Sequence, residues 1–242
     1  MRVLIISDIH ANLAAFQAVL ADAQGQWDVI WCLGDLVGYG PDPNECVALL
    51  REHEHISLSG NHDWAVLGKL DIQNFNREAQ IAIRWTRQAI SSETHDYLSD
   101  LPPSLVQPPF TLAHASPRQP VWEYILDAYV AAINFDHFET PYCLVGHTHV
   151  PVIFAEAEDY HVTLQKPDYN VPRLLQTQRL IINPGSVGQP RDSDPRAAYS
   201  LLDTEQNSWL HKRVEYPVAV TQQKMREFGI PSRLIKRLEF GL

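Results

Sequence analysis

Short apolar runs that stop abruptly at polar residues recur in the first quarter of this 242-residue sequence. Residues 3–6 lead into Asp8 and His10, and residues 29–33 lead into Asp35. A third run follows and also ends in a polar cluster. Because the segments between the runs carry apolar residues at helical spacing, the pattern predicts a βαβαβ arrangement and therefore a parallel sheet.

The polar clusters are candidates for function, because ligands of an open α/β sheet bind outside the carboxyl ends of its strands. The candidate metal ligands are, in chain order, Asp8, His10, Asp35, Asn61, His114, His147 and His149. Oxygen and imidazole nitrogen donors of this kind suit Mn, Fe or Zn better than calcium. Seven donors are too many for one ion and suit two ions that share a carboxylate. The alternative for the first pair is that Asp8 caps a helix and His10 is a polar loop residue.

The rest of the chain predicts further layers around this sheet. Residues 64–103 are expected to be helical, either as a layer that covers the sheet or as a cap over the site with Trp64 and Trp85 as its walls. Residues 121–138 are expected to be largely helical. Short apolar runs between residues 150 and 214, with no helices between them, predict a second, mostly antiparallel sheet.

Composition limits the classes of partner and compartment. Lys and Arg total 19 against 29 Asp and Glu, a formal net charge of −10, so we expect no general binding to nucleic acids or anionic membranes. An anionic substrate would need local positive charge, which bound cations supply. The three cysteines fit no disulfide framework, and no signal peptide or membrane span is visible, so the expected location is cytoplasmic. No stretch of the sequence has the composition of a linker, so we expect one domain over residues 1–242. The sequence does not decide its oligomeric state.

Five motifs follow one another along the chain: Asp8-Ile9-His10, Gly34-Asp35, Gly60-Asn61-His62-Asp63, a lone His114, and Gly146-His147-Thr148-His149. In content and order they resemble the motifs of the calcineurin-like metallophosphoesterase superfamily, over residues 5–196. The resemblance implies an α/β fold, namely a four-layer α/β/β/α sandwich with a dinuclear metal site at the C-terminal strand ends.

The resemblance also implies a role for each motif residue. One metal ion would be held by Asp8, His10 and His149. The other would be held by Asn61, His114 and His147, with Asp35 bridging the two. A hydroxide shared by the metal ions would attack phosphorus in line. His62 would protonate the leaving oxygen or stabilise the transition state, and Asp63 or Asp35 would orient it.

Two departures from the family patterns narrow the subclass. Ser/Thr protein phosphatases have an arginine four residues after the bridging Asp, where this chain has Tyr39. Purple acid phosphatases have a tyrosine three residues after it, where this chain has Gly38. The chain is more similar to the small prokaryotic phosphodiesterase-like branch, which implies hydrolysis of phosphodiesters or nucleotide-like compounds. The alternatives are a phosphomonoesterase or dinucleoside-polyphosphate hydrolase and, outside enzymes, a binding or scaffold protein on the same fold.

Candidates for binding the substrate lie outside the metal motifs. Residues 183–191 form a Gly- and Pro-rich loop whose free backbone N–H groups, with Arg191, are expected to hold an anion. The alternative is a structural turn that carries a surface arginine. Arg118, four residues after His114, is a similar candidate. Tyr39 either packs on the organic group of a diester or simply packs its own loop.

Overall fold

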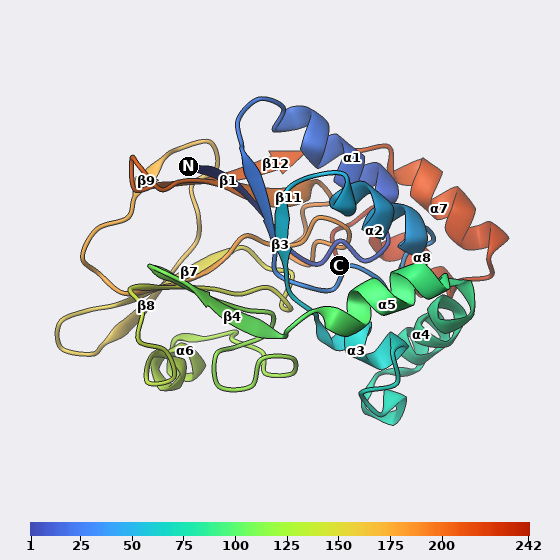
Figure 1. The fold of residues 1–242 in the computed structure, drawn as a ribbon, viewed down its shortest axis with the longest axis horizontal. Coiled ribbons are helices and arrows are strands. Elements are labelled where there is room, and N and C mark those ends of the chain that lie inside the picture. The colour runs from blue at the N-terminus through green and yellow to red at the C-terminus, as the bar shows by residue number, and fades with distance from the viewer.

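Two six-stranded mixed sheets pack face to face in the computed structural model, which describes residues 1–242 (Figure 1). Sheet A contains, from edge to edge, β3 (His55–Ser57), β2 (Val29–Cys32), β1 (Arg2–Ile6), β11 (Ala197–Asp203), β12 (Ser208–Val214) and β9 (Arg173–Leu174). Sheet B contains β4 (Ser104–Gln107), β5 (Phe110–Ala113), β6 (Tyr142–Leu144), β10 (Leu180–Asn183), β7 (Val152–Glu156) and β8 (Val162–Gln165).

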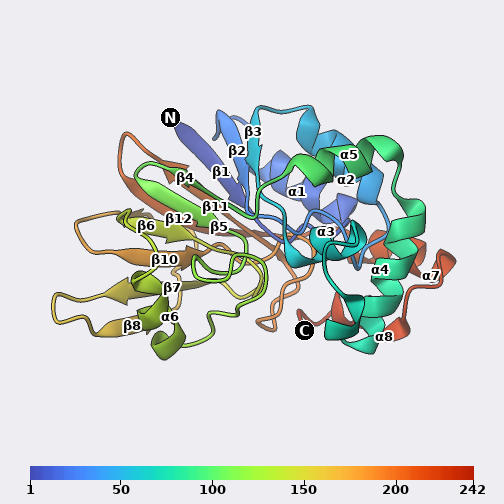
Figure 2. The same cartoon turned by 60° about the horizontal axis from the view of Figure 1, so that its bottom comes forward.

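Helices cover the outer faces of both sheets, most of them on sheet A, whereas α6 alone lies beside β7 and β8 (Figure 2). The helices are α1 (Leu13–Asp22), α2 (Pro43–Arg51), α3 (Asn61–Val66), the 3-10 turn η1 (Ile72–Asn74), α4 (Arg77–Ala89), α5 (Ser92–Asp100), α6 (Ala128–Phe135), α7 (Val218–Glu227) and α8 (Ser232–Arg237). No helix combines the length and the apolar character needed to cross a membrane. All three cysteines are buried and unpaired.

Three buried hydrophobic cores lie between these layers and hold them together. The largest contains 31 residues, among them Leu4 and Phe16, and lies between sheet A and its helices. A core of 17 residues that includes Ile5 fills the space between the sheets. The third contains 10 residues and joins sheet B to α6 through Phe135 and Phe154. Three cores between four layers confirm the predicted α/β/β/α sandwich, and the smallest core reflects the single helix that covers sheet B.

Parallel strands bring the candidate ligands to one edge of each sheet. β1, β2 and β3 run parallel in sheet A, so Asp8, His10, Asp35 and Asn61 all follow the carboxyl ends of neighbouring strands. β5, β6 and β10 run parallel in sheet B. His114 follows the carboxyl end of β5, and His147 and His149 follow that of β6. The βαβαβ prediction for the first three strands is confirmed.

The prediction of a second, mostly antiparallel sheet is met only in part, because sheet B has mostly antiparallel pairs but does not contain all of the predicted strands. β11 and β12 pair with β1 in sheet A, with Val3 opposite Leu202, while β7, β8 and β10 complete sheet B beside the parallel strands β5 and β6. The reason is that a strand buried on both faces still has two edges to pair, and an apolar run does not identify its partner.

The predicted helical regions are also more broken than expected. Residues 64–103 contain α3, η1, α4 and α5 instead of one continuous layer. Within residues 121–138 only α6 is helical. The segment before α6 is held as a loop because the Glu123 carboxylate accepts hydrogen bonds from Ser116 Oγ and Asn134 Nδ2, both at 2.8 Å.

Candidate metal centre

Left-handed backbone turns, and not extended strands, aim the candidate ligands. Asp8, His10, Asp35, His147 and His149 have φ angles of 53°, 49°, 53°, 63° and 61°. Such angles are uncommon for residues other than glycine and cost about 1–3 kcal/mol each when the surroundings enforce them. Asp8 and His10 do converge as predicted, but by turning after β1 ends. The concentration of strained residues at these strand ends is typical of a functional site.

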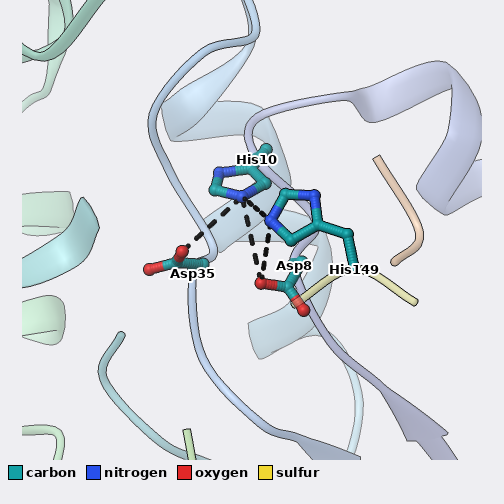
Figure 3. Close-up of side chains that lie close together, drawn as sticks. All are labelled: Asp8, His10, Asp35 and His149. Carbon is teal, nitrogen blue, oxygen red and sulfur yellow. Dashed lines mark hydrogen bonds and ion pairs between the residues drawn. The ribbon is translucent and has the colours of Figure 1, made fainter. Parts of the chain in front are cut away.

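Four of these side chains form one compact donor group (Figure 3). His10 Nε2 lies 3.0 Å from His149 Nε2 and 3.5 Å from Asp35 Oδ2. Asp8 Oδ1 lies 3.3 Å from His149 Nε2 and 3.9 Å from His10 Nε2. These separations suit atoms that surround one ion at bond lengths of about 2.0–2.2 Å. The four side chains are buried, so the donors face one another and not solvent.

A second donor group shares Asp35 with the first. It contains Asp35, His114 and His147, and the Oδ1 of Asn61 joins it at 3.2 Å from His114 Nε2. Asp35 Oδ2 lies 3.5 Å from His114 Nε2, the same distance that separates it from His10 Nε2. The Asp35 carboxylate therefore stands midway between two sets of donors, as a bridging ligand would.

Outer hydrogen bonds fix the histidine rings so that their Nε2 atoms face the centre. In each case Nδ1 bonds to a backbone carbonyl, which sets the tautomer and orientation of a metal-ligating histidine. The pairs are His10 with Val37 at 3.2 Å, His114 with Leu33 at 2.8 Å and His149 with Gln189 at 2.6 Å.

Protonation states in the centre favour cation binding. Burial lowers the pKa of His10 and His149, and lowers that of His147 to about 3, so these rings are neutral at pH 7. Burial disfavours the charge of Asp35, but the neighbouring His114 and His62 outweigh it and hold the Asp35 pKa well below its usual range. Burial would also lower the pKa of His114, yet Asp35 raises it to about 9. A cation beside Asp35 would replace that proton.

Two unpaired atoms test whether the residues fit metal ions. Asp35 Oδ2 and His147 Nε2 are buried and have no hydrogen-bond partner. A buried polar atom without a partner costs about 1–3 kcal/mol, and more when it is charged. Both atoms point to the two donor groups, where bound cations would satisfy them. The donor set therefore fits two divalent ions of the Mn, Fe or Zn type.

Glycine is required where side chains of the centre approach the backbone. A Cβ on Gly60 would lie 2.0 Å from Asp35 Oδ1, and a Cβ on Gly146 would lie 1.9 Å from Ser7 Oγ. Contacts under 3.0 Å are essentially never made by real Cβ atoms. Close packing against Asp35 and Ser7 therefore explains why glycine precedes Asn61 and His147 in the sequence motifs.

His62 lies beside the first donor group without joining it. Its backbone N–H donates to Asp35 Oδ1 at 2.9 Å, and its ring centroid lies 4.9 Å from that of His10 and 4.3 Å from that of Tyr39. Its Nδ1 is buried without a partner. Burial lowers the pKa of His62 to about 4, which makes it neutral at pH 7 before any substrate binds.

Asp63, expected with Asp35 as a residue that orients His62, acts on the backbone around His62 and not on its ring. The Asp63 carboxylate accepts backbone N–H groups from Gly60 at 2.8 Å, Val37 at 3.1 Å and Leu36 at 3.4 Å. It thus ties the turn after β2 to the start of α3. The Asp35 carboxylate contacts His62 directly, by accepting its backbone N–H.

The loop of residues 183–191 braces the centre instead of offering free N–H groups. The N–H groups of Val187 and Gly188 donate to the carbonyls of Ser7 and Asp8, at 3.0 and 2.9 Å. Those of two further loop residues donate to side chains inside the loop itself. The expected anion site made of backbone N–H groups is therefore absent from this loop.

Arg191 does lie at the centre, although Arg118 does not contact it. The Arg191 guanidinium carbon is 5.8 Å from the ring centroid of Tyr39, Nη2 donates to Gln189 Oε1 at 2.8 Å, and Nε is buried without a partner. Arg118 instead pairs with Glu123.

Sequence reasoning missed the aromatic residues around the centre. Tyr124 stacks on His147 with ring centroids 3.9 Å apart, and Phe75 lies 5.2 Å from His62 and 5.1 Å from Trp122. These residues belong to loops without a motif, so no spacing rule identifies them. Trp85, considered as a wall of the site, packs on Phe228 at 5.1 Å. For Trp122 and Tyr124, the one sequence signal was that two aromatic residues follow His114 within ten positions.

Comparison with known proteins agrees with this centre. The family model of the calcineurin-like phosphoesterase superfamily domain matches residues 1–207. The chain is 38% identical over 243 residues to the uncharacterised protein MJ0912 of Methanocaldococcus jannaschii, covering 98% of this chain and 97% of that protein.

Two solved structures are similar over their whole length. A metallophosphoesterase from Sphaerobacter thermophilus has 49% sequence identity and a TM-score of 0.92, covering 100% of this chain and 99% of that one. The hypothetical protein PH1004 from Pyrococcus horikoshii has 20% identity and a TM-score of 0.81, covering 100% and 98%, and shares the fold. From the family match, these relatives and the donor groups joined at Asp35, we conclude that the chain belongs to the calcineurin-like phosphoesterase superfamily.

Proposed function

We propose that this chain is a metal-dependent hydrolase of phosphoesters that acts on small phosphodiesters or nucleotide-like compounds. The observation that carries the proposal is the position of Asp35 Oδ2, 3.5 Å from the Nε2 atoms of both His10 and His114. A carboxylate between two donor groups is the arrangement of a two-ion site. Two bound cations would supply Lewis acidity and an activated water nucleophile at neutral pH.

In this proposal each residue of the centre has a separate task. Asp8, His10 and His149 hold one ion, Asn61, His114 and His147 hold the other, and Asp35 holds both. Asp63 supports the site by fixing the turns that carry Asp35 and His62. His62 gives a hydrogen bond or a proton to the leaving oxygen. The whole chain would act as one metallophosphoesterase domain, in which the helical segment of residues 64–103 adds Phe75 beside His62.

The preference for diesters rests on the charge near Tyr39. A phosphomonoester carries close to two negative charges at neutral pH, as phosphoserine does, and gains from fixed arginines. Tyr39 is neutral and buried, with the Arg191 guanidinium beside its ring and the charge of Arg237 also close enough to act on it. A diester carries one negative charge and a second organic group. Having Tyr39 in place of an arginine therefore weakens the binding of a diester less than the binding of a monoester. The net charge of −10 and three buried free thiols support a small-molecule substrate and a reducing, cytoplasmic compartment.

The test compares catalytic efficiency, kcat/KM, with Mn²⁺ on bis-p-nitrophenyl phosphate, p-nitrophenyl phosphate and a phosphopeptide. We expect the diester to be preferred and the Tyr39→Arg variant to shift the preference toward the monoester. Wild-type preference for the phosphopeptide would overturn the diester assignment. Stoichiometric binding of two ions without turnover of any ester would instead favour a binding or scaffold role.

Arg191 is expected to hold the phosphoryl group. A charge-assisted hydrogen bond is worth about 1.5–3 kcal/mol, so Arg191→Ala should lower kcat/KM by roughly tenfold or more. Arg118→Ala is the matched control, because the Arg118 guanidinium is already paired with Glu123. A loss in Arg118→Ala with no loss in Arg191→Ala would reverse the assignment.

A further inference from the structure

One buried hydroxyl connects two ligands of the first donor group, Asp8 and His149. Ser186 Oγ donates to the backbone carbonyl of Asp8 at 2.8 Å and accepts the backbone N–H of Gln189 at the same distance. The Gln189 carbonyl in turn accepts a hydrogen bond from His149 Nδ1 at 2.6 Å. All four residues are buried. Because Asp8 follows β1 in sheet A and His149 follows β6 in sheet B, these three hydrogen bonds link the two sheets at the metal centre.

The backbone conformation of the two ligands explains why they need this support. Asp8 and His149 have φ angles of 53° and 61°, which residues other than glycine keep only where the surroundings fix them. The Asp8 carbonyl accepts a second hydrogen bond, from the N–H of Gly188 at 2.9 Å. Asp8 Oδ1 lies 3.3 Å from His149 Nε2 (Figure 3). Ligand distances in a metal site vary by only about 0.2 Å, so a small shift of either backbone would weaken ion binding.

The second donor group lacks this connection. Ser186 and Gln189 form no hydrogen bond with the ligands that belong to that group alone, namely Asn61, His114 and His147. The His114 ring is fixed instead by the carbonyl of Leu33, at 2.8 Å. One contact links the groups, because the His147 backbone N–H donates to the Asp8 carboxylate at 3.1 Å, but it does not involve the His147 ring.

We propose that Ser186 is a positioning residue for the ion of the first donor group, because its hydroxyl sets the relative position of Asp8 and His149. The ion of the second donor group is held without it. The inference rests on the proposed two-ion site and adds that the two ions have separate supports. It also assigns a role to the loop of residues 183–191, which braces the centre and offers no backbone anion site.

The same support reaches the residue expected to hold the phosphoryl group. Gln189 Oε1 accepts a hydrogen bond from Arg191 Nη2 at 2.8 Å, while the Gln189 backbone bonds to Ser186 and His149. A single buried residue therefore positions both a ligand of the first ion and the arginine beside it.

The test measures Mn²⁺ binding by each donor group separately. His10→Ala removes a ligand of the first ion only, and Asn61→Ala removes a ligand of the second ion only. Ser186→Ala in the Asn61→Ala background should raise the dissociation constant of the remaining ion by about 10- to 100-fold, the usual cost of losing an outer hydrogen-bond partner of a metal ligand. In the His10→Ala background it should leave the dissociation constant nearly unchanged. Paramagnetic resonance of free Mn²⁺ gives both constants without any substrate.

Ser200→Ala is the matched control, because Ser200 is equally buried and its hydroxyl has no hydrogen-bond partner. It should change neither dissociation constant. Equal weakening of both ions by Ser186→Ala would mean that this hydroxyl supports the fold in general, which would refute the proposal. So would unchanged binding in the Asn61→Ala background.

Nuclear magnetic resonance of the metal-free wild-type protein tests the same hydrogen bonds without a variant. In EDTA the His149 ring should be the Nδ1–H tautomer, and the Gln189 N–H should exchange slowly with solvent. An Nε2–H tautomer or a rapidly exchanging Gln189 N–H would contradict the proposal even if Ser186→Ala did not fold.

The outcomes also separate this inference from the hydrolase proposal. Two-ion binding with the expected effect of Ser186→Ala, but without turnover of any ester, would refute the hydrolase and retain the role of Ser186. Ester turnover with metal affinities that do not respond to Ser186→Ala would do the reverse.

Discussion

His62 shows how a single residue acquires a role from its surroundings. Its ring packs against His10 and Tyr39 beside the donor groups, yet it belongs to neither group. His62→Ala should therefore leave the content of bound metal unchanged and lower kcat by about 10²- to 10⁴-fold, the usual cost of losing a general acid. Metal analysis and turnover of phenyl and p-nitrophenyl esters measure the two effects.

The dependence on the leaving group distinguishes proton transfer from charge stabilisation at His62. Good leaving groups need little protonation, so the loss should be smaller for p-nitrophenyl than for phenyl esters. An equal loss for both would argue against proton donation and for a hydrogen bond to the phosphoryl group. His95→Ala, at an exposed histidine, serves as the control.

At the scale of elements, the loop between β5 and α6 is fixed by Glu123. Burial would raise the pKa of Glu123, but hydrogen bonds from Arg118, Asn134 and Ser116 outweigh burial and lower the pKa to about 2. A pKa below the unfolded value of about 4.3 stabilises the folded state above that pH, and this stabilisation is lost as the pH falls toward the folded value. Glu123→Gln should thus unfold more easily than wild type at pH 7, by about 1–2 kcal/mol.

Urea unfolding at several pH values measures this contribution of Glu123. The difference between wild type and Glu123→Gln should shrink steadily between pH 5 and pH 3. Glu93→Gln is a suitable comparison, because its ion pair with Arg51 is exposed. A difference that stays constant over this range would mean that the Glu123 carboxylate is not responsible.

At the scale of the whole molecule, bound ions would join the two sheets. Sheet A supplies Asp8, His10, Asp35 and Asn61, and sheet B supplies His114, His147 and His149. One ion at a hundred times its dissociation constant stabilises the fold by about 2.7 kcal/mol. For a chain of this size that raises Tm by roughly 5–10 °C. EDTA should therefore lower the wild-type Tm, measured by calorimetry together with metal content.

Asp35→Ala should abolish most of this metal effect, because one carboxylate serves both donor groups. The variant should lose both ions and show little change in Tm with EDTA, whereas Asp28→Asn, at an exposed aspartate, should behave like wild type. Retention of two tightly bound ions by Asp35→Ala would contradict the assignment of a bridging ligand.

The sequence by itself determined the features that depend on neighbouring residues. Apolar runs of four or five residues define the strands β1 and β2, and the polar residues after each strand identify the candidate ligands. Parallel strands of one sheet end at a common edge, so the expectation that Asp8, His10 and Asp35 meet needed no further information, whereas the later histidines follow strands of the second sheet and were placed with them by the resemblance to the family. The fold class followed from the same order of motifs.

The tertiary structure decided what depends on residues distant in the chain. Only the folded chain pairs β11 with β1, since a buried strand does not encode its partner. Only packing shows that N–H groups of the 183–191 loop donate to the carbonyls of Ser7 and Asp8. The same is true of the pairing of Arg118 with Glu123 and of the stacking of Tyr124 on His147. These contacts depend on distances of a few ångströms, whether the partners are close in the chain, as Arg118 and Glu123 are, or far apart, as Ser7 and Val187 are, and no local periodicity records those distances.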